Sequence, residues 1–136
     1  MFTVKKVLNS SKAAPEFVYL SPTLGASYKA GTLLTHRNGQ LVNCSATEKP
    51  THLAVKTVEK ASIHTLIPAV ALTPDVILET VPTSYPSLFH VGEKYDLLID
   101  GDYAVSIKST KNNGVATIVS NYDSLVVGDP LWVKFE

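Results

Sequence analysis

The sequence is poor in cysteine, in tryptophan and in net charge. Among its 136 residues it has one cysteine, Cys44, and one tryptophan, and its twelve basic residues balance twelve acidic ones. A single cysteine excludes an intrachain disulfide and a multi-cysteine zinc site, and it suits a reducing compartment. A net charge of zero argues against a nucleic-acid-binding protein, because neutralising phosphates requires a basic excess. It also leaves little electrostatic repulsion between copies, which favours a chain that assembles.

A long apolar run is also missing. The longest, from Ile67 to Leu72, is interrupted by Pro68 and is too short to span a bilayer. Residues 1–8 include two lysines but no apolar stretch long enough for a signal peptide. We therefore expect no membrane partner, and we expect the chain to be made and kept in solution inside a cell.

Helical periodicity is absent, and short β-prone runs take its place. Eight prolines and seven glycines are spread along the whole chain. The segments between them are rich in valine, isoleucine, leucine, threonine and tyrosine, which is typical of strands bounded by turns. The sequence therefore predicts an all-β fold, with strands at 2–7, 16–20, 31–37, 40–42, 52–58, 62–72, 76–81, 94–99, 103–108, 115–120 and 131–135.

Three turns are marked by their residue types. Asn38 and Gly39 separate two apolar runs, and both tolerate the positive φ that a tight hairpin requires. Asp100-Gly101-Asp102 predicts a turn rather than a calcium loop, because Tyr103-Ala104-Val105 follows where further oxygen ligands would be needed. The third turn is predicted at 111–114, where two asparagines precede Gly114.

Composition changes at one place along the chain. Residues 82–92 are rich in proline, serine and aromatic residues, which is typical of a loop or a connector. We therefore predict an N-terminal arm at 1–15, a first β domain at 16–81, a connector at 82–93, and a small C-terminal β lobe or barrel at 94–136.

The residues able to carry chemistry form no recognisable motif. Four histidines, at 36, 52, 64 and 90, lack the spacing of a zinc site, which needs three or four converging ligands. No serine lies in a Gly-x-Ser-x-Gly elbow, and the glycines never cluster into a phosphate-binding loop. Cys44 is expected to be a small buried residue at the end of a strand. We therefore predict no catalytic residue, no metal ligand and no cofactor.

Aromatic residues near the connector are candidates for contact with another molecule. Tyr85, Phe89 and Tyr95 surround it, and rings provide a large contact area at low entropic cost. The plainer interpretation is that these rings dock on the neighbouring lobe. The alternative is contact with a partner protein or a sugar, to which Trp132 would contribute.

Three segments within residues 27–60 follow one another in a distinctive order: Ala30-Gly31-Thr32-Leu33-Leu34, the turn Arg37-Asn38-Gly39-Gln40-Leu41-Val42, and Pro50-Thr51-His52-Leu53-Ala54-Val55. This order resembles the head decoration proteins of tailed phages, the lambda-type capsid-stabilising family with a β-clip or β-tulip fold. Other β-clip domains open with a similar Ala-Gly-Thr-Leu-Leu phrase. The resemblance assigns a β-clip-like fold to residues 16–81, whereas residues 82–136 depart from the simplest members of the family.

The resemblance implies a non-enzymatic protein that decorates and stabilises a phage capsid by binding its outer surface. It implies a homotrimer whose partner is the major capsid protein, made in the host cytoplasm and located on the virion. In that family an N-terminal arm adds to capsid strands through main-chain hydrogen bonds. The corresponding capsid-binding residues here would be Phe2, Thr3, Val4, Lys5, Lys6 and Val7.

Two alternatives belong to other functional classes. A carbohydrate- or protein-binding β module would use Tyr85, Phe89 and Trp132. An enzyme on a β-clip scaffold, such as a nucleotide hydrolase, would need a carboxylate cluster that binds magnesium, and the densest carboxylates are Asp96, Asp100 and Asp102.

Overall fold

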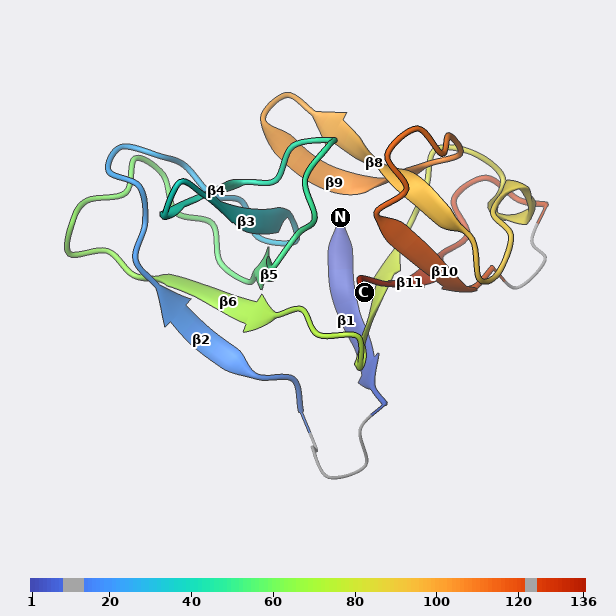
Figure 1. The fold of residues 1–136 in the computed structure, drawn as a ribbon, viewed down its shortest axis with the longest axis horizontal. Helices are drawn as coiled ribbons and strands as arrows, with labels where there is room; N and C mark the ends of the chain where they lie inside the picture. The colour runs from blue at the N-terminus through green and yellow to red at the C-terminus, as the bar shows by residue number, and fades with distance from the viewer. Residues whose placement is uncertain (9–13, 122–124) are drawn as a thin grey trace.

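The computed structural model describes residues 1–8, 14–121 and 125–136. In these ranges the chain forms strands and one short 3-10 helix, η1 (Pro86–Leu88), and no α-helix, which confirms the predicted all-β fold (Figure 1). No helix within the same ranges is long and apolar enough to cross a membrane. The strands are β1 (Phe2–Val7), β2 (Phe17–Leu20), β3 (Leu33–Arg37), β4 (Gln40–Asn43), β5 (His52–Ala54), β6 (Ile67–Ala71), β7 (Val76–Thr80), β8 (Lys94–Asp100), β9 (Tyr103–Lys108), β10 (Ala116–Ser120) and β11 (Leu131–Lys134).

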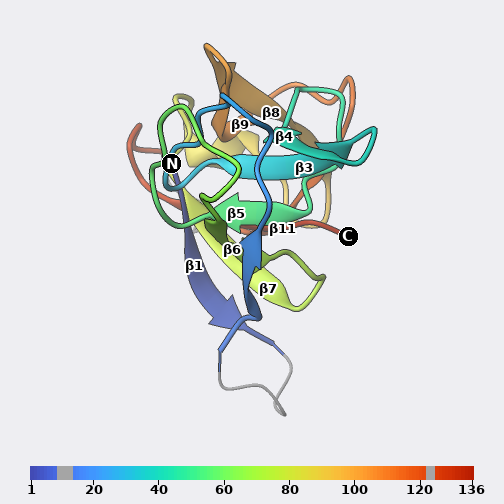
Figure 2. The same cartoon turned by 90° about the vertical axis from the view of Figure 1, so that its left-hand side faces the viewer.

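These strands belong to one curved sheet. Its order is β1-β7-β11-β10-β8-β9-β3-β5-β6-β2, with β4 paired to β3 beside this path. Figures 1 and 2 show the sheet curling into a half-barrel, and Figure 1 shows β1 and β2 apart from each other. The path therefore ends in two edge strands, β1 and β2. Among the described strands β4 pairs only with β3, and on its other side the Leu41 carbonyl accepts from the hydroxyls of Thr23 and Tyr28.

The two predicted hairpin turns, at Asn38-Gly39 and at Asp100-Gly101-Asp102, are confirmed. Asn38 and Gly39 have φ of 52° and 78°, and they join β3 to β4 as the two central residues of a hairpin. Both positive angles match the turn whose twist fits a two-residue hairpin. Gly101, with φ of 61°, lies between Asp100 at the end of β8 and Tyr103 at the start of β9.

Two predicted strands are too long. β5 ends at Ala54, because beyond it Tyr28 and Val58 exchange main-chain hydrogen bonds of 2.8 Å and turn the chain away from the sheet. Val55, within the strand predicted at 52–58, is exposed. Likewise, the strand predicted at 62–72 begins only at Ile67. In both segments, contacts with distant parts of the chain decide where the strand begins or ends, rather than the local β-prone sequence.

Strand pairing crosses the predicted domain boundaries. β7, from the predicted first domain, pairs with β11 from the predicted C-terminal lobe and with β1 from the predicted arm. β3 also meets β9 across the same boundary, through Leu33 and Ala104. The connector at 82–93 therefore joins two parts of one sheet, because the long-range pairing of β7 leaves no local signal in the sequence.

Buried apolar side chains form two clusters. The larger one draws residues from the whole length of the chain, including Phe2, Leu33, Leu78, Leu97 and Val133. The smaller one lies within the predicted first domain and consists of Tyr28, Leu34, Leu41, Ala54, Ala61 and Ile67. The larger core ties the predicted arm and lobe to the rest of the molecule.

Candidate functional site

The predicted capsid-binding residues lie on β1, which is an integral strand of the sheet. Phe2 is only 1% exposed and packs edge-on against Phe135, with the ring centroids 6.2 Å apart. Its amide donates to the carbonyl of Gly31 at 2.8 Å. Phe2 therefore cannot be a capsid contact in this conformation, and the prediction for this residue is corrected. Its neighbours Thr3, Lys5 and Lys6 are exposed, and Val4 and Val7 are half-buried.

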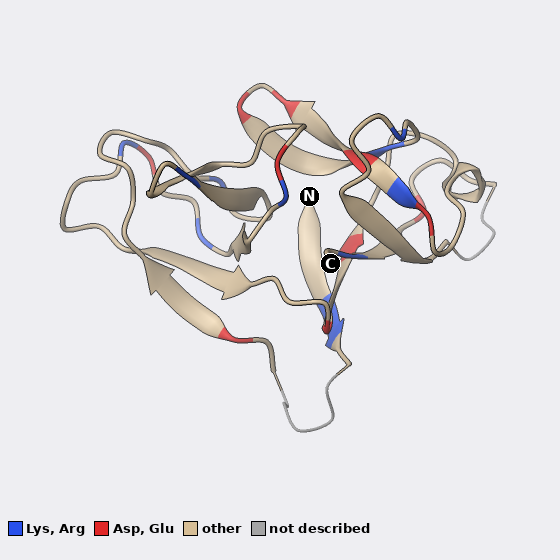
Figure 3. Ribbon diagram, in the orientation of Figure 1, with Lys and Arg blue, Asp and Glu red and all other residues tan. Residues whose placement is uncertain are grey.

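The lysines of β1 lie close to Trp132, which was predicted to contact a partner together with Tyr85 and Phe89. The Nζ atoms of Lys5 and Lys6 each lie 5.4 Å from the centroid of the Trp132 ring. Trp132 Nε1 donates to Glu79 Oε2 at 3.0 Å, and Lys5 Nζ lies 3.4 Å from the same oxygen. Contacts of this kind, cation over ring, contribute about 0.5–1 kcal/mol at exposed sites. In Figure 3 the lower end of β1 is blue, the colour of lysine and arginine.

These four residues, Lys5, Lys6, Glu79 and Trp132, form what we call the Trp132 cluster. Glu79 is the member that sequence reasoning missed. It lies opposite Thr3 and Trp132 in the sheet register, so its place depends on the pairing of β7 with both β1 and β11. No local motif in the sequence predicts that β7 pairs with both β1 and β11.

Phe89 is part of the core. It is fully buried and packs against Tyr95, with the ring centroids 5.0 Å apart. Its carbonyl accepts from Asn121 Nδ2 at 2.6 Å. Phe89 is therefore unavailable to a partner, and the plainer interpretation of the connector rings, docking on the molecule itself, holds for this residue.

Tyr85 does present its ring to solvent. It is 50% exposed, just before η1, and Leu88 and Val91 in the same segment are also exposed. Residues 125–127, which are Leu, Val and Val, are exposed on the loop before β11. Both segments lie at the right-hand end of the molecule in Figure 1. Of the three aromatic residues predicted as partner contacts, Tyr85 is the one whose ring is free enough to serve.

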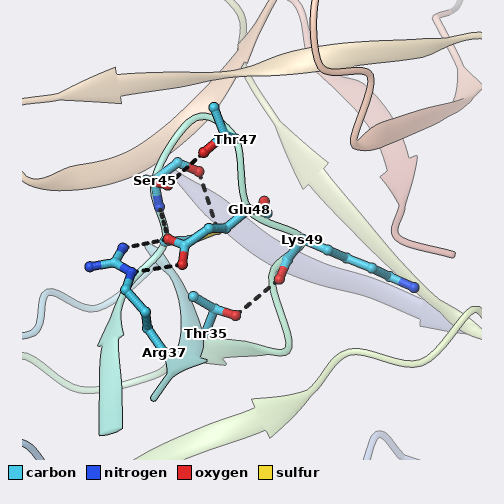
Figure 4. Close-up of polar contacts among 7 residues, drawn as sticks. Thr35, Arg37, Ser45, Thr47, Glu48 and Lys49 are labelled. Carbon is cyan, nitrogen blue, oxygen red and sulfur yellow. Dashed lines mark hydrogen bonds and ion pairs between the residues drawn. The ribbon is translucent and has the colours of Figure 1, made fainter. Parts of the chain in front are cut away.

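A clasp between Arg37 and the loop after β4 was not predicted. Arg37 Nε and Nη2 donate to the two carboxylate oxygens of Glu48 at 2.9 and 2.5 Å, and the amide of Ser45 donates to the same carboxylate at 3.0 Å (Figure 4). The hydrogen bond from Arg37 is the main reason that the pKa of Glu48 falls to about 2. Thr35 Oγ1 donates to the Lys49 carbonyl at 3.0 Å and holds the far end of the loop.

Cys44 lies behind this clasp. It is buried, as predicted, and its Sγ donates to the carbonyl of Glu48 at 3.3 Å. Burial raises the pKa of the thiol to about 12. Since the thiolate is the nucleophilic form, the cysteine is a packed residue with little reactivity.

A groove of about 600 Å³ lies beside the clasp. It is lined by the loop before Tyr28, the β3–β4 hairpin and the β8–β9 turn, and its charged residues are Arg37 and Asp102. The guanidinium of Arg37 already carries the bidentate pair with Glu48. The positive charge of Arg37 is therefore neutralised by Glu48 within the protein.

The densest carboxylates do not converge. Asp96 is buried and accepts from Thr110 Oγ1 at 2.5 Å and from the amides of residues 112–114 at 2.6–3.0 Å. Asp102 is exposed in the β8–β9 turn. Asp96 thus holds a turn together, and its donors are protein groups rather than a cation.

Histidines from two strands do come together. His36 and His52 have ring centroids 5.8 Å apart. Burial and the nearby His36 lower the pKa of His52. Within the described ranges, no group of three histidine, cysteine, aspartate or glutamate side chains could hold a metal ion.

Comparison with known proteins rests on the fold. No protein-family model and no curated protein sequence matches this chain. Among solved structures, it is similar to the crystal structure of the head fiber gp8.5 N base of bacteriophage phi29, with a TM-score of 0.53 and 16% sequence identity. The superposition covers 89% of this chain and 95% of the other. The two chains therefore share one all-β fold along almost their whole lengths.

Proposed function

We propose that this chain is a structural, non-catalytic protein of a tailed-phage virion that binds the outer surface of the head. The observation that carries the proposal is the shared fold with the base of a head fiber, which extends over 89% and 95% of the two chains. A likeness of that extent concerns the whole architecture rather than one recurring motif. A fold alone can host several functions, so a second and separate observation is needed.

That second observation is the segment order in residues 27–60, which resembles head decoration proteins. It comes from local sequence, whereas the fold comparison comes from the arrangement of all the strands. Both lead to the exterior of a phage head. The proposed partner is therefore the major capsid protein, and the proposed location is the virion surface after synthesis in the host cytoplasm.

Capsid stabilisation, a β-clip fold and a homotrimeric state follow from the lambda-type resemblance and stay predictions. A fibre base and a stabilising decoration protein differ in their effect on the shell. A decoration protein raises the temperature at which heads break open, whereas a base that only anchors a fibre leaves it unchanged. Thermal melting of heads with and without the protein distinguishes the two.

The alternative of a carbohydrate-binding module loses most of its predicted contact surface. Phe89 is buried, and Trp132 is held by Glu79 and the two lysines of β1. Of the three predicted rings, Tyr85 is the one that is half-exposed, and the exposed pair Phe17 and Tyr19 on β2 lies outside the predicted contact surface.

Co-sedimentation tests the proposed function. Purified protein is mixed with expanded heads made from the major capsid protein of the same phage, and bound protein is measured in the pellet. We expect saturable binding to expanded heads. Unassembled capsid protein and heads of an unrelated phage serve as controls. Protein that stays in the supernatant at every ratio would contradict the proposal.

A further inference from the structure

The two edge strands of the sheet differ in how they are protected against pairing with another strand. β1 carries Lys5 and Lys6, its register with β7 is interrupted between Val4 and Lys6, and the Phe2 amide is already bound to Gly31. Edge lysines, bulges and covering loops are the devices by which proteins keep an exposed edge from pairing. β1 is therefore a protected edge.

Among the described residues, β2 has no lysine, no register shift and no strand on its outer side. It lies in a stretch, 17–28, that contains no charged residue, and its neighbour β6 lies in a second uncharged stretch, 61–74. The four residues of β2 pair with Ile67–Val70 of β6 without a register shift. Phe17 and Tyr19 are 49% and 64% exposed on one face of β2, with their ring centroids 5.2 Å apart.

The hydrogen-bond direction shows which main-chain groups of β2 are unpaired. The amide of Ala71 donates to the carbonyl of Glu16 at 3.0 Å, so Glu16 directs its main-chain groups toward β6. Antiparallel pairing alternates, so Val18 and Leu20 also face β6. Phe17 and Tyr19 therefore direct their N–H and C=O groups outward, where no described strand lies. Figure 1 shows β2 with β6 along its upper side and no labelled strand along its lower side.

We propose that β2 is the edge through which two copies of this chain pair, antiparallel, about a twofold axis at Val18. In this register, Phe17 of one copy faces Tyr19 of the other, and each pair exchanges N–H and C=O groups. The aromatic rings of both copies then lie on the same face of the joined sheet. Aromatic cross-strand pairs stabilise such contacts.

The distribution of charge favours a second copy of this chain as the partner of the β2 edge. Self-pairing of β2 places Val18 opposite Val18 and Glu16 opposite Leu20, so no like charges meet. Self-pairing of β1 would instead bring Lys5 and Lys6 toward the same lysines of the other copy, which is repulsive. The whole chain has a net charge of zero, so two copies approach without long-range repulsion.

Sedimentation velocity of the purified chain tests this pairing. We expect a dimer whose fraction rises with protein concentration. Tyr19→Lys should raise the dimer dissociation constant at least about tenfold, because a charge is buried against the rings of the other copy. Tyr85→Lys is the matched control, since it makes the same change at a similarly exposed tyrosine away from β2 and should leave the dimer intact.

A second variant tests the main-chain part of the contact. Tyr19→Pro removes an outward N–H and no bond to β6, so the fold tolerates it as an edge proline. We expect it to weaken the dimer, also by about tenfold or more, since both copies lose a donor. Tyr19→Ala keeps the N–H and separates the loss of the ring from the loss of the donor.

Hydrogen exchange of the wild-type chain, followed by NMR, gives a readout that needs no variant. The amides of Phe17 and Tyr19 should exchange quickly in dilute protein and slow down as the concentration rises. Those of Val18 and Leu20 should stay slow throughout, because they bond to β6. A chain that is monomeric at all concentrations would overturn the pairing, as would an oligomer that Tyr19→Lys leaves intact.

Protection of Phe17 and Tyr19 only on phage heads would assign the edge to the capsid protein and also overturn pairing between copies. The inference is independent of the proposed function, because these measurements use the purified chain alone. An edge that pairs with itself yields a dimer. Its mass therefore differs from that of the homotrimer implied by the lambda-type resemblance.

Discussion

At the scale of single residues, Asp96 connects β8 to the turn that leads into β10. Its buried carboxylate accepts four hydrogen bonds, from Thr110 and from the amides of residues 112–114. Burial alone would raise the pKa of this group, but these hydrogen bonds outweigh it and lower the pKa to about 2. The turn itself was predictable from Asn112, Asn113 and Gly114, whereas its distant anchor was not.

Replacing Asp96 tests this anchoring. Asp96→Asn keeps the shape but removes the charge and turns an amide group toward backbone donors. We expect the free energy of unfolding to fall by about 2 kcal/mol, measured by urea denaturation. Asp102→Asn, at an exposed position of the β8–β9 turn, should change it by less than about 0.5 kcal/mol. Equal effects of the two substitutions would contradict the assignment.

The same residue predicts a pH dependence. The folded pKa of Asp96, about 2, lies below its ordinary value of 3.8. Its stabilisation is therefore complete above about pH 4 and is lost as the pH falls toward 2, amounting to about 2 kcal/mol. Stability measured across this range should be less acid-sensitive in Asp96→Asn than in the wild type. Glu48, whose pKa is also about 2, should still contribute its own loss in both proteins.

At the scale of elements, β1 is the strand whose interpretation changed most. Local composition predicted an extended segment correctly, but it could not tell a free arm from a sheet strand. The partner, β7, is more than sixty residues further along, and the register Phe2 opposite Thr80 is fixed by burial of Phe2 beside Phe135. The hairpin of β3 and β4 was predictable, since Asn38 and Gly39 carry a local requirement for positive φ.

Truncating the Phe2 side chain distinguishes an integral strand from a free arm. Phe2→Ala removes a fully buried ring, and we expect a loss of about 3–5 kcal/mol in the free energy of unfolding. Thr3→Ala, one residue further and exposed, should have little effect. If β1 were detached in solution, thermal and urea unfolding would show no difference between the two variants.

At the scale of the whole molecule, the chain is one open sheet with two unlike edges. The sequence composition was sufficient to predict the all-β class, because short β-branched runs between turns are local signals. It was not sufficient to predict how the parts join, since β7 with β11 and β3 with β9 pair across a proline-rich segment that resembled a boundary. The Trp132 cluster was missed for the same reason. Its members come from three strands that neighbour one another only after folding.

The proposed role places this sheet on the surface of a phage head. A protein of that kind works through main-chain edges and packed surfaces, and it needs no reactive group. The thiol of Cys44 is buried and weakly acidic, and the charge of Arg37 is paired with Glu48; both features agree with that role. The exposed residues of β1 and the half-exposed Tyr85 are the contacts to examine once a bound state is seen.

Electron cryomicroscopy of expanded heads incubated with the purified protein tests whether the protein binds the outer surface of the head. We expect added density on the outer surface of the shell, at symmetry-related positions, into which this half-barrel fits. Heads prepared without the protein provide the reference map. A map identical to that reference, at protein concentrations that saturate any specific site, would contradict the claim.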